Sequence, residues 1–286
     1  MMKTTKKTLV TLLAAIGVAA SAPASAIIVG GIDFGAMGAN PANTHIETAT
    51  LAQTLITGNG QNATAYGFIS TVNGDSTYCA DGSANCGLYY VAHFNNSQNF
   101  SAGYVEFTSS SVSVFYSASP AINLLGQDSN ANLLTIQGMT AWATLTGHDH
   151  LGGIAANNAV LNGGGTLTGA SLSGSGFGLL DVNLAGPGSL SVANYLNGNS
   201  ISDSIGNKAD IALTSSFNNF VLNPNDQANG LANGCLTGQA AAGAWCFQGT
   251  NNLRGNTVIP EPGMLGLMGI GLLGFGVAAS RRRKTA

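Results

Sequence analysis

Hydrophobic residues in the central part of the chain recur in short runs, and in several runs they alternate with polar residues. In residues 104–107 and 112–116 the apolar side chains fall partly at every second position, as in strands with one buried face. Clusters of Asn, Gly, Ser and Asp separate the runs and favour turns. We expect strands at residues 65–72, 88–94, 104–117, 133–145, 179–184 and 210–222.

No part of residues 27–258 shows a sustained apolar repeat of 3.6 residues with helix caps. Residues 228–244 have room for a short helix, but their glycines argue against a long one. The pattern therefore predicts a mainly β body, folded as an antiparallel β-sandwich or jelly roll. A glycine-rich tract at 152–188 either divides this body near 150–165 or belongs to one sheet, and its leucines favour ordered structure.

Charge is scarce in this chain and unevenly placed. Only 7% of its 286 residues are charged, against about 25% in an ordinary soluble domain. Between residues 27 and 259, Lys208 and Arg254 are the only basic residues other than histidine beside eleven carboxylates. Binding to phosphate backbones needs clustered Lys and Arg, so nucleic acid is excluded as a partner.

The N-terminus has the three parts of a secretory signal peptide. Lys3, Lys6 and Lys7 precede an apolar stretch at 9–20, and Ala24-Ser25-Ala26 ends the segment with small residues at the cleavage positions. An N-terminal membrane anchor is the alternative, but the apolar stretch is short. We expect residues 1–26 to direct export through the general secretion machinery, with signal peptidase cutting after Ala26.

The C-terminus combines a Pro-Glu-Pro box with an apolar segment and a basic tail. Pro260, Glu261 and Pro262 precede the uncharged residues 263–280, which as a helix would rise about 27 Å, near the hydrocarbon thickness of a bilayer. This pattern predicts one C-terminal transmembrane helix. The basic residues behind it keep that end in the cytoplasm and leave the body outside; they are Arg281, Arg282, Arg283 and Lys284.

Residues 259–284 resemble the PEP-CTERM sorting signal of Gram-negative bacteria, which has these three parts in this order. The resemblance implies recognition by an exosortase, a membrane-embedded enzyme similar to cysteine transpeptidases, in species that make exopolysaccharide. Pro260, Glu261 and Pro262 then mark the recognition site. The protein would be anchored in the membrane only transiently, before it reaches the cell surface or the medium. The resemblance leaves residues 27–258 unassigned.

Four cysteines follow the signal peptide, and an even number in an exported chain indicates disulfides. Proximity in the sequence favours the pairs Cys79–Cys86 and Cys235–Cys246. A zinc site is the alternative, but neither spacing is the short one that such sites commonly use.

His148-Asp149-His150 is the best metal candidate, because residues two apart on a strand face the same side. His45 or His93 could supply a third ligand, although a solvated turn explains the motif as well. Closely spaced oxygen donors at 203–210 and 223–226 suit calcium, but neither segment fits the EF-hand frame. We expect no cofactor.

Catalytic motifs are missing from the sequence: it has no G-x-S-x-G elbow and no H-E-x-x-H. Two carboxylates such as Glu47 and Glu106 would suffice for a polysaccharide hydrolase. Aromatic residues exposed on a β domain would instead suit sugar binding; the candidates are Tyr89, Tyr90, Phe94, Phe100, Tyr104, Trp142 and Trp245. The leading hypothesis is a non-catalytic structural or adhesive component of exopolysaccharide or biofilm. The alternatives are an exported carbohydrate- or calcium-binding module and a secreted polysaccharide hydrolase.

Overall fold

The computed structural model describes residues 26–36, 43–83, 85–119, 122–151 and 158–256. Most of the expected signal peptide, including Ala24, and the whole expected C-terminal signal, including the helix at 263–280, lie outside these residues. Among the residues described, no helix is long and apolar enough to cross a membrane.

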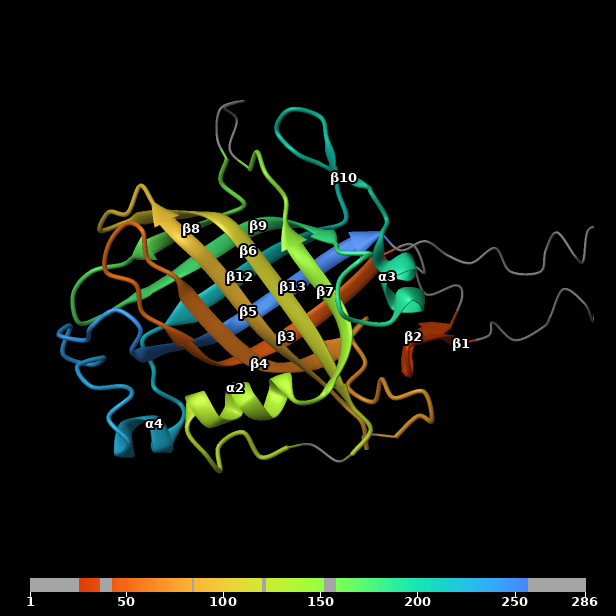
Figure 1. The fold of residues 1–286 in the computed structure, drawn as a ribbon, viewed down its shortest axis with the longest axis horizontal. Coiled ribbons are helices and arrows are strands. Elements are labelled where there is room, and N and C mark those ends of the chain that lie inside the picture. The colour runs from red at the N-terminus through yellow and green to blue at the C-terminus, as the bar shows by residue number, and fades with distance from the viewer. Residues whose placement is uncertain (1–25, 37–42, 84, 120–121, 152–157, 257–286) are drawn as a thin grey trace, which may run out of the picture.

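The described residues form a closed antiparallel β-barrel with eight strand positions (Figure 1). The sheet runs in the order β12-β13-β3-β4-β5-β6-β7-β9, and pairing of β12 with β9 closes it. The mainly β prediction is confirmed, but the sandwich or jelly roll is wrong, because every strand in this ring has a partner on both sides. The strands are β3 Asn43–Thr54, β4 Ala63–Val72, β5 Gly87–Gln98, β6 Tyr104–Ser117, β7 Thr140–Gly147, β9 Ser173–Val182, β12 Ile211–Asn218 and β13 Trp245–Asn256.

One strand position of the barrel is shared by two short strands. β7 pairs with the second half of β6, while β8 (Leu161–Thr166) pairs with the first half of the same strand. On the other side, both β7 and β8 pair with β9. The glycine-rich tract therefore contributes strands to the same sheet as the residues before it.

Helix α2 (Ser129–Gln137) lies across the outer face of the barrel (Figure 1). The Asp128 carboxylate caps it by accepting a hydrogen bond from the Ala131 N–H at 2.9 Å, and the chain leaves the helix at Gly138. The strand expected at 133–145 is wrong for its first part, which is helical; β7 begins at Thr140. The cap at Asp128 outweighs the β-like composition of the segment.

Strand β5 shows why the sequence of a wall strand can be almost continuously hydrophobic. Leu88, Tyr90 and Ala92 belong to the core inside the barrel, whereas Tyr89 and Val91 pack outside with the cluster that includes Ile136 of α2. Alternate residues of a strand face opposite sides, so a strand covered on both faces loses the polar alternation.

Different elements close the two ends of the barrel (Figure 1). At one end lie β1 (Ala26–Val29), β2 (Ile32–Ala36) and α3 (Leu190–Leu196), where Trp142 donates its ring N–H to the Gly30 carbonyl at 2.9 Å. At the other end lie α4 (Pro224–Ala228) and the turns that follow it. The short helix considered for residues 228–244 is not found there, since the helix ends at Ala228. The hairpin of β10 (Ile201–Ser202) and β11 (Lys208–Ala209) projects beside the wall.

Both expected disulfides are present, and no free cysteine occurs among the described residues. Cys79–Cys86 closes a loop between β4 and β5. Cys235–Cys246 ties the long connection after α4 to the start of β13, next to a small hydrophobic cluster that includes Leu55 and Phe247.

Candidate functional site

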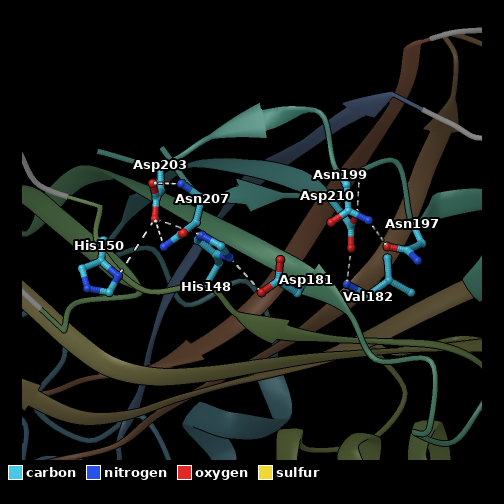
Figure 2. Close-up of polar contacts among 9 residues, drawn as sticks. All are labelled: His148, His150, Asp181, Val182, Asn197, Asn199, Asp203, Asn207 and Asp210. Carbon is cyan, nitrogen blue, oxygen red and sulfur yellow. Dashed lines mark hydrogen bonds and ion pairs between the residues drawn. The ribbon is translucent and has the colours of Figure 1, made fainter. Parts of the chain in front are cut away.

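His148 lies where β7 ends and β8 takes over its position in the wall. Its backbone N–H still donates to the Leu179 carbonyl of β9 at 2.8 Å, so the residue is fixed to the sheet. Its side chain is only 11% exposed and lies between two carboxylates (Figure 2).

These carboxylates come from β9 and from the hairpin beyond it. The Nδ1 atom of His148 is 2.8 Å from Asp181 Oδ2, and its Nε2 atom is 3.3 Å from Asp203 Oδ2. Asp181 is 40% exposed, whereas the Asp203 side chain is fully buried. We call His148, Asp181 and Asp203 the histidine clamp, because they join β7, β9 and the β10–β11 hairpin.

The turn of the hairpin fixes Asp203 through three further hydrogen bonds. Its Oδ1 atom accepts from the backbone N–H groups of Ile205 at 2.9 Å and Asn207 at 2.7 Å, and its Oδ2 atom accepts from the Asn207 side chain at 3.1 Å. Burial alone would raise the pKa of Asp203, but these donors and His148 lower it overall. The buried carboxylate is therefore held in its charged form.

The same contacts favour a protonated His148. Burial alone would lower the pKa of the imidazole, but the hydrogen bonds and charges of Asp181, and then of Asp203, outweigh it and raise the pKa. A protonated imidazole donates from both nitrogens, which matches a carboxylate at each of them. The contacts within the histidine clamp therefore stabilise the protonated form of the imidazole.

The structure brings both histidines of the expected metal motif toward one carboxylate. His150 Nδ1 lies 4.0 Å from Asp203 Oδ2, and its φ of 66° places it in a turn after β7, so strand alternation does not govern the pair. His45 and His93 lie on β3 and β5, where they contact Asn252 and Thr64 respectively. The described residues contain no group of three ligands able to hold a metal ion.

The two segments considered for calcium direct their oxygens to protein partners. Beyond Asp203, Asp210 accepts from the backbone N–H of Val182 at 2.8 Å and of Asn199 at 2.7 Å (Figure 2). Burial raises the pKa of Asp210. In the second segment, Asn223 caps α4 and Asp226 accepts the backbone N–H of Ser129 at 2.7 Å.

The carboxylates Glu47 and Glu106 do not form a hydrolase pair. Both lie on the outer face of the barrel, on β3 and β6, with β4 and β5 between them. Three strand spacings amount to about 14 Å, beyond the roughly 5–9.5 Å that glycosidases use. Glu106 is also buried, and its oxygens accept hydrogen bonds from Gln98, Asn99 and the Tyr104 hydroxyl.

Most of the aromatic residues considered for sugar binding are buried. Tyr104 is 39% exposed and Phe100 is half-buried, whereas the other five are core residues. An exposed aromatic residue outside that set is Phe177 of β9, which is 38% exposed.

Phe177 lies within an outer surface that carries hydroxyl and amide groups. Across the strands, Phe177 pairs with Asn162 of β8 and Thr214 of β12, and Thr214 pairs with Asn252 of β13. In the neighbouring row, Ser175 pairs with Ser216, whose hydroxyl lies 3.0 Å from that of Thr250. We call these seven residues of β8, β9, β12 and β13 the polar face.

The comparison with known proteins bears on the C-terminal residues. Residues 258–283 match the family model of the PEP-CTERM protein-sorting motif. The chain carries a PEP-CTERM sorting motif. No curated protein and no solved structure matches the chain.

The PEP-CTERM motif implies an exported protein that exosortase processes at the membrane, as the sequence predicted. The two disulfides are consistent with a location outside the cytoplasm. The motif starts two residues after Asn256, the last residue of β13, so the barrel precedes it directly.

Proposed function

We propose that this protein is a non-catalytic structural or adhesive component of the extracellular polysaccharide layer, to which exosortase delivers it. The observation that carries the proposal is the PEP-CTERM motif placed directly after a disulfide-bonded barrel. A rigid, closed barrel has no unpaired sheet edge along its ring, which suits a protein that must persist outside the cell without aggregating.

The polar face supports binding to a glycan. Hydroxyl and amide groups of Ser175, Thr214 and Asn252 can exchange hydrogen bonds with sugar hydroxyls, and the ring of Phe177 offers an apolar surface on which a sugar can stack. None of the seven side chains carries a charge. The face therefore suits a neutral stretch of polysaccharide, bound weakly and repeatedly along its length.

Binding to the host's own exopolysaccharide tests the proposal. Phe177→Ala should weaken co-sedimentation of the exported protein with this polymer by about fivefold or more, because it removes the stacking surface. Phe68→Ala is the matched control, since Phe68 is 37% exposed on β4, outside the polar face. It should leave the binding unchanged.

The same preparation distinguishes the alternative functions. A hydrolase would release reducing ends from the polysaccharide over time. A calcium-binding module would stop co-sedimenting with the polymer when a chelator is added. Either result, or no binding by the unmodified protein, would contradict the proposal.

A further inference from the structure

A cavity of about 60 Å³ lies inside the barrel near the end that carries the Cys235–Cys246 disulfide. Small residues leave this space open: Ala63 and Ala65 of β4, Gly163 of β8 and Gly176 of β9 all line it. A Cβ atom at Gly163 would lie 3.3 Å from the Val105 side chain, so the glycine keeps this part of the interior free. Aromatic rings line much of the remainder.

A second cavity of about 160 Å³ adjoins the first toward the end of the barrel. Leu55, Phe100 and Leu167 line both cavities and so form the partition between them. Thr57 and Thr168 add hydroxyl groups to the outer cavity. An apolar cavity of roughly 150 Å³ is large enough to admit benzene, so the outer cavity has the size of a small ligand.

The side chains that line the two cavities indicate which kind of ligand would fit. None of the described residues that line either cavity carries a charge. In the inner cavity, the amide nitrogen of Asn251 already donates to the hydroxyls of Thr50 at 3.1 Å and Tyr90 at 3.2 Å. A charged group would lose its hydration without compensation there, whereas an apolar chain gains from leaving water.

We propose that this end of the barrel binds an unbranched alkyl chain with an uncharged polar head, such as a medium-chain alcohol. The chain passes the partition at Phe100 into the inner cavity, and the head remains near Thr57 and Thr168 in the outer one. Eight-stranded barrels have an interior just wide enough for side chains or one small ligand, and the glycines and alanines here leave room for the latter. The proposal concerns the interior and does not depend on glycan binding outside.

Calorimetric titration of the exported protein with 1-octanol tests the proposal. We expect saturable binding, with at least tenfold weaker binding of 1,8-octanediol, because the second hydroxyl would have to enter the apolar inner cavity. Affinity should rise along the series from 1-butanol and level off once the chain fills both cavities.

Two variants that fill the cavities test whether 1-octanol binds there. Ala65→Leu should reduce 1-octanol affinity about tenfold, and Gly163→Ala should reduce it less and favour shorter alcohols. Thr64→Val is the control, since Thr64 lies beside Ala65 on the outer face, where it contacts His93. Gly163→Ala supplies the test if Ala65→Leu does not fold. Absence of saturable 1-octanol binding, equal affinity for the diol, or unchanged affinity in folded filling variants would overturn the proposal.

Discussion

Gly163 of β8 lies directly opposite Gly176 of β9, and both line the interior of the barrel. The residues between the glycines of β9 face the other way, so Ser175 and Phe177 are exposed on the polar face. One alternating sequence thus produces two features, a partly empty interior and an uncharged exterior. This alternation around Gly176 makes the glycine-rich tract part of the barrel wall.

Gly67 permits a close approach between the neighbouring strands β4 and β3. A Cβ atom at this residue would lie 1.9 Å from the Ala49 carbonyl oxygen of β3, next to a register shift at Thr50. Gly67→Ala should therefore lower the free energy of unfolding by about 2 kcal/mol or more. Gly58→Ala, whose new Cβ would have only a Gln61 side-chain atom at 3.7 Å nearby, should change it little. Equal stability of the two variants in urea titrations would contradict the described wall.

The histidine clamp predicts that stability depends on pH with a defined sign. The pKa of His148 is raised on folding, so its contribution is complete below the ordinary value of 6.5 and is lost as the pH rises through the higher folded value. The pKa of Asp203 is lowered, so its contribution is lost as the pH falls below about 3.8. The clamp should therefore stabilise the fold most between about pH 4 and pH 6.5.

Urea unfolding of His148→Gln at pH 5.5 and pH 8.5 measures this contribution. We expect a loss of about 1 kcal/mol at pH 5.5 and a smaller one at pH 8.5; the figure is modest because solvent screens Asp181. His93→Gln is a control of opposite sign, since burial lowers the pKa of His93. That variant should gain stability relative to the unmodified protein as the pH falls. An equal loss for His148→Gln at both pH values would rule out the protonated clamp.

The Cys235–Cys246 disulfide, near the two cavities, should contribute strongly to stability. Replacing Cys235 and Cys246 together with alanine releases a loop of sequence separation 11 and should lower the free energy of unfolding by about 2–3 kcal/mol. Replacing Cys79 and Cys86, separated by 7, should cost slightly less. Unchanged unfolding of either double variant under non-reducing conditions would show that the bridge does not constrain the chain.

A buried polar contact attaches α2 and α4 to the barrel. The hydroxyl of Ser129 contacts both Asp226 and the Tyr66 hydroxyl, the latter at 2.9 Å, and all three residues are fully buried. Ser129→Ala would leave both partners short of a hydrogen bond and should lower the free energy of unfolding by about 1–3 kcal/mol. Ser191→Ala, on the exposed side of α3, should leave the free energy of unfolding almost unchanged in the same urea titration. A neutral Ser129→Ala would show that the contact does not stabilise the attachment.

The sequence predicts the strands that form the core most clearly. Residues 104–117 coincide with β6, and residues 65–72 and 88–94 lie within β4 and β5. The strands β3 and β13 were missed, because their many Thr, Ala and Asn residues lack a long apolar run. The polar residues Thr48, Thr50 and Asn251 still face the interior, where Thr50 and Asn251 contact Tyr90. Local composition does not reveal such partners.

The candidate sites depend on contacts between distant residues, and this limits their prediction. His148 was singled out from the sequence, but its partners Asp181 and Asp203 lie 33 and 55 residues away. Closure of the barrel likewise depends on β12 pairing with β9, which no local pattern specifies. For Phe177 a signal was present, since it lies in an alternating Ser-Gly-Ser-Gly-Phe-Gly run at 173–178, which is the pattern of a strand with one small-residue face.

The intact mass of the protein from its native host tests the central claim most directly. Cells and medium are fractionated, and the protein in each fraction is weighed without reduction. We expect a chain that begins at Ile27 and ends between Pro260 and Gly263, four hydrogens lighter than the reduced form, with any attached glycan as added mass. A chain that continues to Ala286 and stays in the membrane fraction would contradict sorting by exosortase.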